Sequence, residues 1–306
     1  MSKSKENAFS KRRIRDLIFC LLVILVPVVQ FCIFYIGVNF NSIAMAFQRY
    51  EVVNNRGEMV FNGLANFGKL FNELRYDAGI ITAFKNSIIV FLVNIAVGTT
   101  LSLFFSVYIY KGMFASKTFR VFLFLPSILS ATITVTMYRN FVETALPEMF
   151  PQIFNGVGLL SNAKTKMFAL LFFMVWASFG TQILMYSGAM NTIEQSVIEA
   201  AKLDGVNSLQ EFFYVILPLI YPTITTFLIT GIAGIFTNQL NLYSFYGNSA
   251  AVQYRTIGYH LFRMVNVGTM AERPLLATYS VVLTLIAAPI TLLGRWLLEK
   301  LGPKTE

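Results

Sequence analysis

The stretch Leu17–Phe40 reads LIFCLLVILVPVVQFCIFYIGVNF and contains no Asp, Glu, Lys, Arg or His. A helix needs about 20 apolar residues to cross the hydrocarbon core of a bilayer, so the stretch predicts a transmembrane helix. Its apolar run is too long for a signal peptide and no small-residue cleavage site follows it, which predicts that the helix is retained. Residues 1–16 precede it as a basic segment, which predicts a cytoplasmic tail.

The composition of the whole chain extends this prediction. The 306 residues are 56% hydrophobic and 13% charged, whereas a soluble domain carries about 25% charged residues. The net charge of +9 is compatible with a nucleic-acid partner, but the distribution of the basic residues argues against one. Six basic residues fall within the first fifteen positions: Lys3, Lys5, Lys11, Arg12, Arg13 and Arg15. Such a cluster before an apolar helix is typical of a membrane anchor, so we expect a lipid bilayer and no nucleic acid as partner.

Six stretches are long and apolar enough to cross a membrane, which predicts an all-α integral membrane protein with six transmembrane helices. They are Leu17–Phe40, Phe84–Tyr110, Phe119–Tyr138, Met167–Met190, Tyr221–Tyr246 and Leu275–Leu298. If the basic tail stays in the cytoplasm, six crossings return the C-terminal tail, residues 299–306, to the same side. Residues 41–83 then form an extracellular loop. Within it, residues 63–71 predict a short amphipathic helix, either at the membrane interface or on an ordinary protein surface.

The loop between the fourth and fifth predicted spans, residues 191–218, predicts a helix–turn–helix outside the membrane. Thr192 with Gln195 fits the capping-box pattern that begins a helix, and Ser208 with Glu211 fits it again. Two prolines then mark the entry to the fifth span. The loop is therefore expected to be ordered.

The first helix of this loop has features that suit docking into a groove on a partner protein. Glu199 and Lys202 are expected to be exposed, Ala200 and Ala201 offer a small-residue face, and Gly205 permits a sharp turn. An ordinary amphipathic surface loop would have the same pattern, so the residues by themselves leave both interpretations open.

Within this loop, one pattern resembles the EAA loop of permease subunits in binding-protein-dependent ABC importers. The pattern is Glu199-Ala200-Ala201-x-x-Asp204-Gly205, followed by Val215-x-Leu217-Pro218. The family has alanine where this chain has Val206 and isoleucine where it has Val215, and both changes are mild. The resemblance implies a type I ABC importer permease fold, in which residues 84–298 form a five-helix core after one additional N-terminal helix.

Three looser matches resemble the maltose-type, carbohydrate branch of the family. They are residues 63–71, residues 236–240 and residues 43–50, the last of which resembles the LplB-like group. The resemblance implies a sugar or oligosaccharide as solute and localisation in a bacterial cell membrane. It also implies three kinds of partner: a second EAA-loop permease, expected to be a different chain, a cytoplasmic ABC ATPase dimer, and an extracellular solute-binding protein.

The energy source is expected to lie on another chain. The only Gly-Lys pair, Gly68-Lys69, is followed by Leu70 and lacks the spacing of a phosphate-binding loop. We therefore expect no cofactor in this chain, with ATP and Mg²⁺ on the partner ATPase. The resemblance implies that the EAA loop contacts that ATPase through Glu199, Ala200, Ala201, Asp204, Gly205, Leu217 and Pro218.

Polar side chains within the predicted spans are candidates for a solute path. The central parts of the spans hold no ionisable residue, which predicts a neutral, hydrogen-bonding solute. The candidate path residues are Asn238, Gln239, Asn241, Tyr243, Ser244 and Gln182. The competing interpretation is that such groups join neighbouring helices, and it applies to the isolated amides Gln182 and Asn94 in particular.

Two further functions stay open as alternatives. An ion-coupled secondary transporter would need a coupling group, although sodium can bind carbonyl and amide oxygens alone. A membrane-embedded enzyme would need carboxylates, metal ligands or a nucleophile–base pair. Glu143 and Glu148 are the nearest candidates, and His260 is expected at the surface of the last outside loop. We predict no catalytic residue and no metal ligand.

Overall fold

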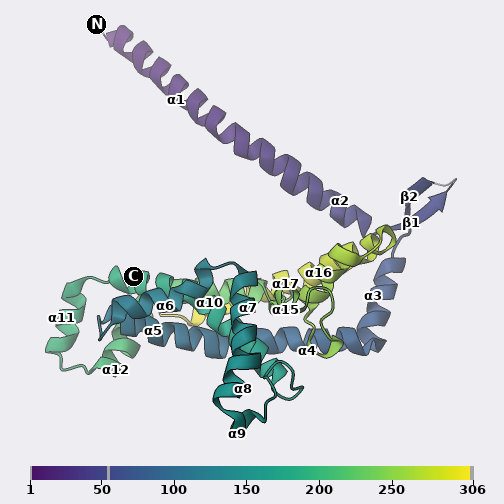
Figure 1. Ribbon diagram of the computed structural model, residues 1–306. Helices are drawn as coiled ribbons and strands as arrows, with labels where there is room; N and C mark the ends of the chain where they lie inside the picture. The colour runs from purple at the N-terminus through teal and green to yellow at the C-terminus, as the bar shows by residue number, and fades with distance from the viewer. Residues whose placement is uncertain (1, 54–55, 304–306) are drawn as a thin grey trace. The chain divides into compact units, whose positions relative to one another are not determined.

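The computed structural model (Figure 1) describes residues 2–53 and 56–303. The chain divides into two compact units. Unit 1 comprises residues 1–71 and 269–281, and unit 2 comprises residues 72–268 and 282–306. Met1 and residues 304–306 of the two predicted tails lie outside the described residues. Each unit is described by itself.

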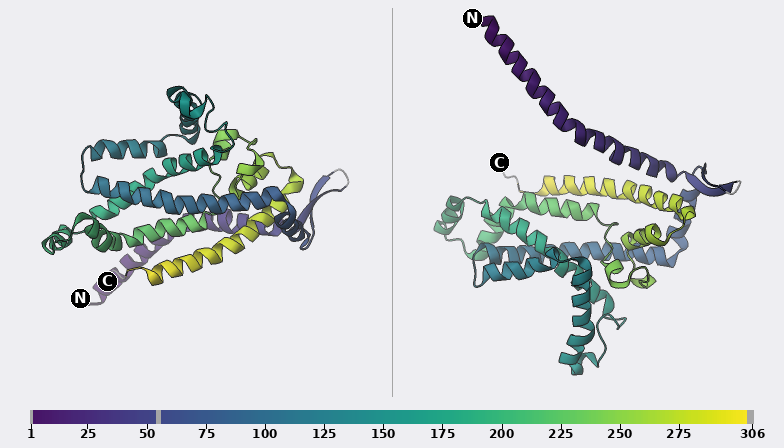
Figure 2. Two further views of the ribbon diagram at one scale, coloured as in Figure 1. Left: turned by 90° about the horizontal axis from the view of Figure 1, so that it is seen from below. Right: turned by 45° about the horizontal axis from the view of Figure 1, so that its top comes forward.

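The first three elements of unit 1 form one continuous helical rod (Figure 2). They are α1 (Ser2–Gln30), the π-helical η1 (Phe31–Gly37) and α2 (Val38–Met45). Helix begins already within the predicted basic tail, so residues 16 and 17 do not mark a structural boundary. The predicted span lies inside this rod, and none of its apolar side chains is buried. Uncovered apolar surface of this length is what contact with lipid requires.

A β-hairpin in unit 1 departs from the all-α expectation. β1 (Gln48–Val53) pairs antiparallel with β2 (Arg56–Phe61). The amide of Asn66 fixes the entry to the hairpin, because its Nδ2 donates to the carbonyl oxygens of Ala46 and Gln48 at 2.9 and 2.6 Å. Neither six-residue strand alternates regularly between polar and apolar residues, so the sequence signal is weak. Long-range bonds of this kind supply the stability that the hairpin lacks by itself.

Asn66 belongs to α3 (Ala65–Tyr76), which confirms a helix where residues 63–71 predicted one. Its place at a membrane interface stays a prediction. The last residues of α3 belong to unit 2. Unit 1 also contains η6 (Met270–Glu272) and the first part of α17 (Arg273–Leu301), which likewise continues into unit 2.

Unit 2 consists of helices joined by short connections. In chain order they are α4 (Ala78–Val93), η2 (Asn94–Thr99), α5 (Thr100–Tyr110), α6 (Ser116–Ile128), α7 (Ala131–Asn140), η3 (Phe141–Ala145), α8 (Leu146–Met149), α9 (Pro151–Phe154), α10 (Lys166–Asn191), α11 (Gln195–Leu203), α12 (Ser208–Gln210), η4 (Glu211–Ile216), α13 (Leu217–Leu219), α14 (Tyr221–Ala233), α15 (Leu242–Tyr246), η5 (Val252–Tyr254), α16 (Ile257–Val267) and the rest of α17.

Four of the six predicted spans lie in helices long and apolar enough to cross a membrane: Ile14–Met45, Ala78–Tyr110, Lys166–Asn191 and Met270–Leu301. The second begins before the predicted Phe84, because the carboxylate of Asp77 caps α4 by accepting from the backbone N–H groups of Gly79 and Ile80.

The other two spans are not straight helices. The third bends by 110° between α6 and α7, because Leu129 and Ser130 are extended and the Ser130 hydroxyl caps α7. The fifth was predicted to run from Tyr221 to Tyr246, but α14 ends at Ala233 and irregular backbone follows.

Helix α10 lies at the centre of unit 2, against α5 and α6. Small residues allow this close approach, as is common where helices pack in membranes. A Cβ atom added to Gly180 would lie 2.8 Å from the carbonyl oxygen of Leu123. The Ser106 hydroxyl is fully buried and lies 3.2 Å from the carbonyl oxygen of Ile183. An aromatic cluster that includes Tyr138, Phe173 and Phe245 fills the core at the α15 end.

Candidate coupling loop and solute path

Residues 191–218, the EAA loop, form the expected helix–turn–helix, which lies beyond the ends of α5 and α6 (Figures 1 and 2). Both predicted capping boxes are wrong in detail. α11 begins after Glu194 without a side-chain cap, and the Thr192 hydroxyl bonds back to the carbonyl oxygen of Ala189. The second box is formed by Asn207 and Gln210, one residue before the predicted pair, because asparagine caps a helix as well as serine does.

Gly205 ends α11 as predicted. Its φ of +76° is in the left-handed region, which glycine adopts without a steric penalty. The Gly205 N–H donates to the carbonyl oxygen of Lys202 at 3.1 Å, and the Val206 N–H donates to that of Ala201 at 3.2 Å. These two bonds are the pair that defines a Schellman cap, so the turn has a single well-defined direction.

The outward face of α11 mixes charge with uncovered apolar surface. Glu199, Ala200 and Lys202 are exposed, and Leu203 retains 89% of its accessible surface. Ala201, by contrast, is buried, so only one alanine of the pattern is available to a partner. Exposed leucine beside a small residue suits contact with a partner protein.

The inward side of the loop is anchored in unit 2. Ile198 packs in a buried cluster with Tyr186 and Met190 of α10 and with Ile216 of η4. Leu217 and Pro218 are partly buried in α13, where the chain bends by 68° into α14. A movement of α11 would therefore displace the ends of two spans together.

A buried ion pair adds to this anchor and was missed from the sequence. The side chain of Glu211 is 8% exposed, and its Oε1 lies 3.5 Å from Nζ of Lys111 at the end of α5. The two residues are far apart in the chain. The one sequence feature that could have indicated the pair is the Glu211 carboxylate at the start of the otherwise apolar run Glu211–Ile216.

The solute path predicted after α14 has irregular backbone. We call residues 237–241 the interrupted segment. Leu240 and Asn241 have positive φ values of 53° and 51° although neither is glycine, and Leu240 is fully buried. Asparagine tolerates this region, whereas leucine adopts it only where surrounding contacts hold it.

Contacts of several kinds hold the interrupted segment. Oδ1 of Asn238 accepts from the Leu240 N–H at 2.8 Å, and the Thr256 hydroxyl donates to the Asn238 carbonyl oxygen at 2.7 Å. Gly258 allows close approach, because a Cβ atom there would lie 2.5 Å from the carbonyl oxygen of Thr237. Asn238 thus has a structural role in addition to any contact with solute.

A cavity of about 270 Å³ opens beside the interrupted segment; we call it the amide cavity. It is lined by Phe91, Asn94, Gly231, Gly234, Ile235, Thr237 and Asn238. Oδ1 of Asn94 is buried and has no hydrogen-bond partner among the described residues. Buried amide oxygens are normally bonded, so an unpartnered one at a cavity indicates a place for water or a ligand.

The structure separates the other predicted path residues from this cavity. Gln239, Asn241 and Ser244 are partly buried, and Tyr243 is 42% exposed with its ring against Phe262. None of these four lines the amide cavity. Gln182 is elsewhere, where its Oε1 accepts from the Ser102 hydroxyl at 2.9 Å between α10 and α5.

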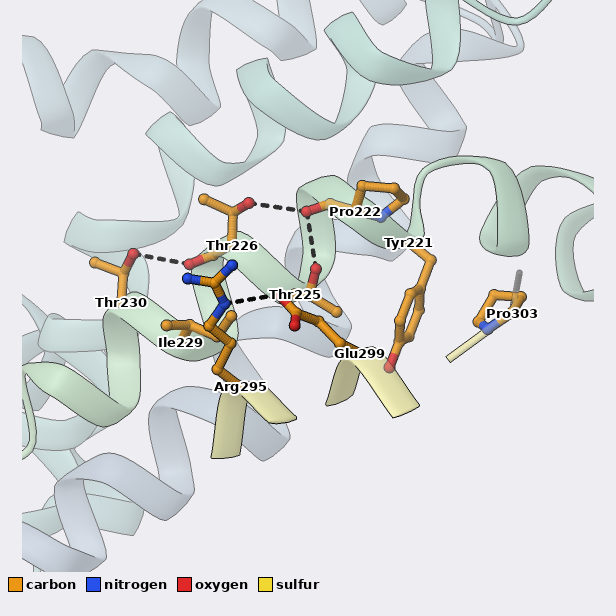
Figure 3. Close-up of a pocket in the computed structure, with 9 residues that line it drawn as sticks. All are labelled: Tyr221, Pro222, Thr225, Thr226, Ile229, Thr230, Arg295, Glu299 and Pro303. Carbon is orange, nitrogen blue, oxygen red and sulfur yellow. Dashed lines mark hydrogen bonds and ion pairs between the residues drawn. The ribbon is translucent and has the colours of Figure 1, made fainter. Parts of the chain in front are cut away.

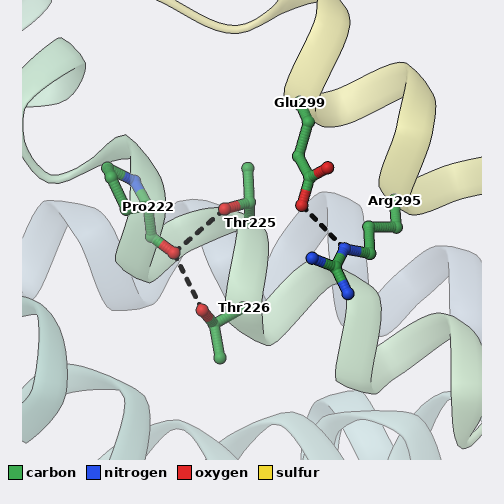
Figure 4. Close-up of polar contacts among 5 residues, drawn as sticks. All are labelled: Pro222, Thr225, Thr226, Arg295 and Glu299. Carbon is green, nitrogen blue, oxygen red and sulfur yellow. Dashed lines mark hydrogen bonds and ion pairs between the residues drawn. The ribbon is translucent and has the colours of Figure 1, made fainter. Parts of the chain in front are cut away.

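A second cavity lies between α14 and the end of α17 (Figure 3). Its polar groups are already engaged. The Thr225 and Thr226 hydroxyls donate to the carbonyl oxygen of Pro222, and Arg295 pairs with Glu299 at 2.7 Å (Figure 4). This cavity therefore offers fewer unsatisfied groups to a solute than the amide cavity does.

Two residues considered from the sequence have structural partners. Glu143 accepts from the backbone N–H groups of Leu160 and Ser161, which ties η3 to the loop before α10. His260 is half-buried on α16 and does not stand at the surface as expected. Burial lowers its pKa, and the nearby Arg255 and Arg263 lower it further, so the neutral form is favoured.

The sequence matches one family over residues 12–306, described as binding-protein-dependent transport system inner membrane component. Its relatives include the arabinooligosaccharides transport system permease protein AraP of Halalkalibacterium halodurans, 29% identical over 62% of this chain and 59% of its own. Another is the probable starch degradation products transport system permease protein AmyD of Thermoanaerobacterium thermosulfurigenes, 26% identical over 68% and 66%. The matched region thus spans about three fifths to two thirds of the length of these relatives.

Solved structures share the fold. A chain of a bacterial ABC transporter involved in the import of the acidic polysaccharide alginate superposes with a TM-score of 0.75 at 19% identity, over 96% of this chain and 99% of that one. At this identity the likeness bears on fold alone, and it confirms the predicted type I permease architecture. The match to the family covers nearly the whole chain, and the chain belongs to the family of binding-protein-dependent transport system inner membrane components.

Proposed function

We propose that this chain is a transmembrane permease subunit of an ATP-driven importer. With a second permease it forms the path for a sugar or oligosaccharide that an extracellular binding protein delivers. The observation that carries the proposal is the EAA loop, whose helix exposes Glu199, Ala200 and Leu203 while Ile198 and Glu211 anchor it in the bundle. Such a loop can contact a partner through its exposed face and transmit a displacement to the bundle through its anchored side.

A separate ABC ATPase, which binds ATP and Mg²⁺, drives the displacement of the EAA loop. Closure of the ATPase pair displaces α11, and the rigid cap at Gly205 keeps the helix at a fixed angle to the turn. Because Ile198 and Glu211 contact α10 and Lys111, the movement reaches the spans. The two access states of the path are then populated according to the nucleotide bound.

The orientation follows from the same assignment. The EAA loop faces the cytoplasm of a bacterial cell, because the ATPase and its nucleotide are there. The basic N-terminal tail, with Lys11, Arg12 and Arg13, lies on the same side, as the distribution of positive charge favours. The C-terminal tail returns to it after the last span.

The solute is proposed to be a saccharide. Two relatives carry names that refer to arabinooligosaccharides and to starch degradation products. In this chain the unpartnered Asn94 oxygen and Asn238 share one cavity, and amides at that position would bond sugar hydroxyls. Gln239, Asn241, Tyr243 and Ser244 extend the path along the irregular backbone. Residues 2–53 and 56–303 show no comparable feature in support of an ion-coupled carrier or a membrane enzyme.

Purification of the tagged chain from its native membranes tests the proposal. We expect a second, different EAA-loop permease and an ABC ATPase to co-purify, and the binding protein to be captured by cross-linking. Glu199→Arg should abolish recovery of the ATPase, because it reverses an exposed charge on α11. Glu148→Arg, a charge reversal at an exposed residue of α8, is the matched control and should leave recovery unchanged. A stable homodimer that transports solute without any ATPase would refute the proposal.

A further inference from the structure

A third cavity, of about 560 Å³, lies within unit 2; we call it the cationic cavity. Arg139 and Glu143 line it from α7 and η3, Ser161 and Lys166 from around the start of α10, and Tyr246 from the end of α15. Its volume falls within the range of about 300–1,000 Å³ that small-molecule sites occupy.

Two cations flank one aromatic ring in this cavity. Cζ of Arg139 lies 5.5 Å from the centroid of the Tyr246 ring, and Nζ of Lys166 lies 5.9 Å from it. Arg139 also donates to the carbonyl oxygen of Phe245. Neither cation forms an ion pair with a carboxylate within residues 2–53 and 56–303.

The one carboxylate of the cavity is engaged elsewhere. Oε1 of Glu143 accepts from the Leu160 N–H and from the Ser161 N–H, the latter at 2.9 Å, and its Oε2 accepts from the Ser161 hydroxyl. These bonds direct both oxygens toward the loop before α10. With two cations and one carboxylate, the lining has a formal charge of +1.

The Tyr246 hydroxyl supplies a second, independent observation. Its oxygen is buried and has no hydrogen-bond partner among the described residues. A buried hydroxyl is normally bonded, so this one indicates a place for a water molecule or a ligand oxygen. Tyr246 ends the helix that directly follows the interrupted segment, so the cationic cavity adjoins the proposed solute path in the sequence.

We propose that the cationic cavity is a subsite for a carboxylate-bearing sugar, such as a uronic acid residue of an oligosaccharide. The carboxylate binds Arg139 and Lys166, and a sugar hydroxyl bonds the Tyr246 oxygen. This inference rests on the proposed function and narrows its solute class from saccharides in general to acidic saccharides. It departs from the neutral solute that the lack of ionisable groups in the spans predicts, because the two cations lie outside the central parts of the spans. Charge-assisted bonds to a carboxylate are about twice as strong as neutral ones, so the subsite would discriminate acidic from neutral sugars.

The test uses the complex purified from native membranes, reconstituted in nanodiscs, with digalacturonate and the neutral disaccharide of the same linkage as probes. Saturation-transfer NMR reports binding of both without requiring transport. We expect Lys166→Gln to weaken digalacturonate binding by about tenfold or more and to change binding of the neutral disaccharide less than twofold. Lys166→Arg should restore binding of digalacturonate.

Lys164→Gln is the matched control. Lys164 is exposed two residues earlier and is not among the residues that line the cationic cavity, so its loss should leave binding of both sugars unchanged. Tyr246→Phe keeps the ring and should weaken digalacturonate binding severalfold.

Equal affinity of the wild-type complex for the two sugars would overturn the proposal, and so would equal digalacturonate affinity of wild type and Lys166→Gln. A third contradicting outcome is that Lys166→Gln reduces only cross-linking to the binding protein. The cations would then contact an acidic surface of that protein. Recovery of the ATPase with the complex tests the proposed function separately.

Discussion

The Gly205 turn and the interrupted segment both leave the right-handed backbone, and they do so by different means. Gly205 has a φ of +76°, and a Cβ atom placed there would meet no atom within 4 Å. Leu240 and Asn241 have similar positive φ values in a crowded environment, and Leu240 is fully buried. One turn is permitted by its own residue, and the other is imposed by its neighbours.

The Gly205 turn is therefore rigid because of local bonds, whereas the interrupted segment is rigid because of packing with its neighbours. At the Gly205 turn, two backbone hydrogen bonds and the absence of a side chain suffice. At the interrupted segment, Asn238, Thr256 and Gly258 must all be in place. We therefore expect substitutions at the first site to change energy coupling with little change in assembly, and those at the second site to change stability and solute recognition together.

The largest effect is expected for Gly258→Ala. The new Cβ atom would lie 2.5 Å from a backbone oxygen, which cannot move without shifting the interrupted segment. Overpacking of this kind costs about 1–3 kcal/mol, and we expect a clear fall in the melting temperature of the purified complex and loss of uptake. Gly188→Ala is the control, since a Cβ atom there meets nothing within 4 Å. Unchanged stability of Gly258→Ala would mean that the segment is not held by packing.

Gly205→Val should abolish uptake while the complex still assembles. A β-branched residue is a steric outlier at this φ, so the turn must reorient and α11 with it. Gly156→Val provides a matched strain, because Gly156 has a φ of +71° and is equally open but lies in the connection that follows α9. Uptake and nucleotide hydrolysis are measured for both. If the two variants lose uptake equally, the role of the EAA loop is not specific.

Alanine variants of Asn94 and Asn238 test whether the amide cavity belongs to the solute path. Asn94→Ala removes an unpartnered oxygen, so the melting temperature should stay unchanged while the apparent affinity for solute falls about five- to a hundredfold, which corresponds to roughly 1–3 kcal/mol. Asn238→Ala also removes the bond to the Leu240 N–H and should lower stability as well. Solute-dependent nucleotide hydrolysis separates the two effects. A solute response that Asn94→Ala leaves untouched would place the path elsewhere.

The smallest effect on uptake is expected at the Lys111–Glu211 pair. Glu211→Gln leaves Lys111 without its counter-charge in a largely buried setting, which should cost about 1–3 kcal/mol and reduce uptake a few-fold. The double variant Lys111→Gln with Glu211→Gln should recover part of the stability, because no unpaired charge remains. A thermal double-mutant cycle measures the coupling between the residues. Strict additivity would show that the pair does not link α5 to the EAA loop.

The spans show how far composition alone determined the fold. Long apolar runs with few charges located four continuous helices, because a bilayer imposes a minimum apolar length on each crossing. The bend at Leu129–Ser130 and the end of α14 at Ala233 escaped prediction, because apolar content is the same in a straight and a broken helix. The β-hairpin escaped as well, since Asn66 fixes it from α3.

The sequence by itself determined the membrane setting, the EAA loop and its glycine cap, because each depends on residues that are neighbours in the chain. Only the tertiary structure placed Asn94 beside Asn238, paired Lys111 with Glu211, and gathered Arg139, Lys166 and Tyr246 around one cavity. Positive φ at Leu240 is the sharpest case, since leucine disfavours that conformation and contacts with the surrounding structure, those of residues 238, 256 and 258 among them, sustain it. Long-range contacts leave no periodic trace in a single sequence, and the sites in this protein depend on them.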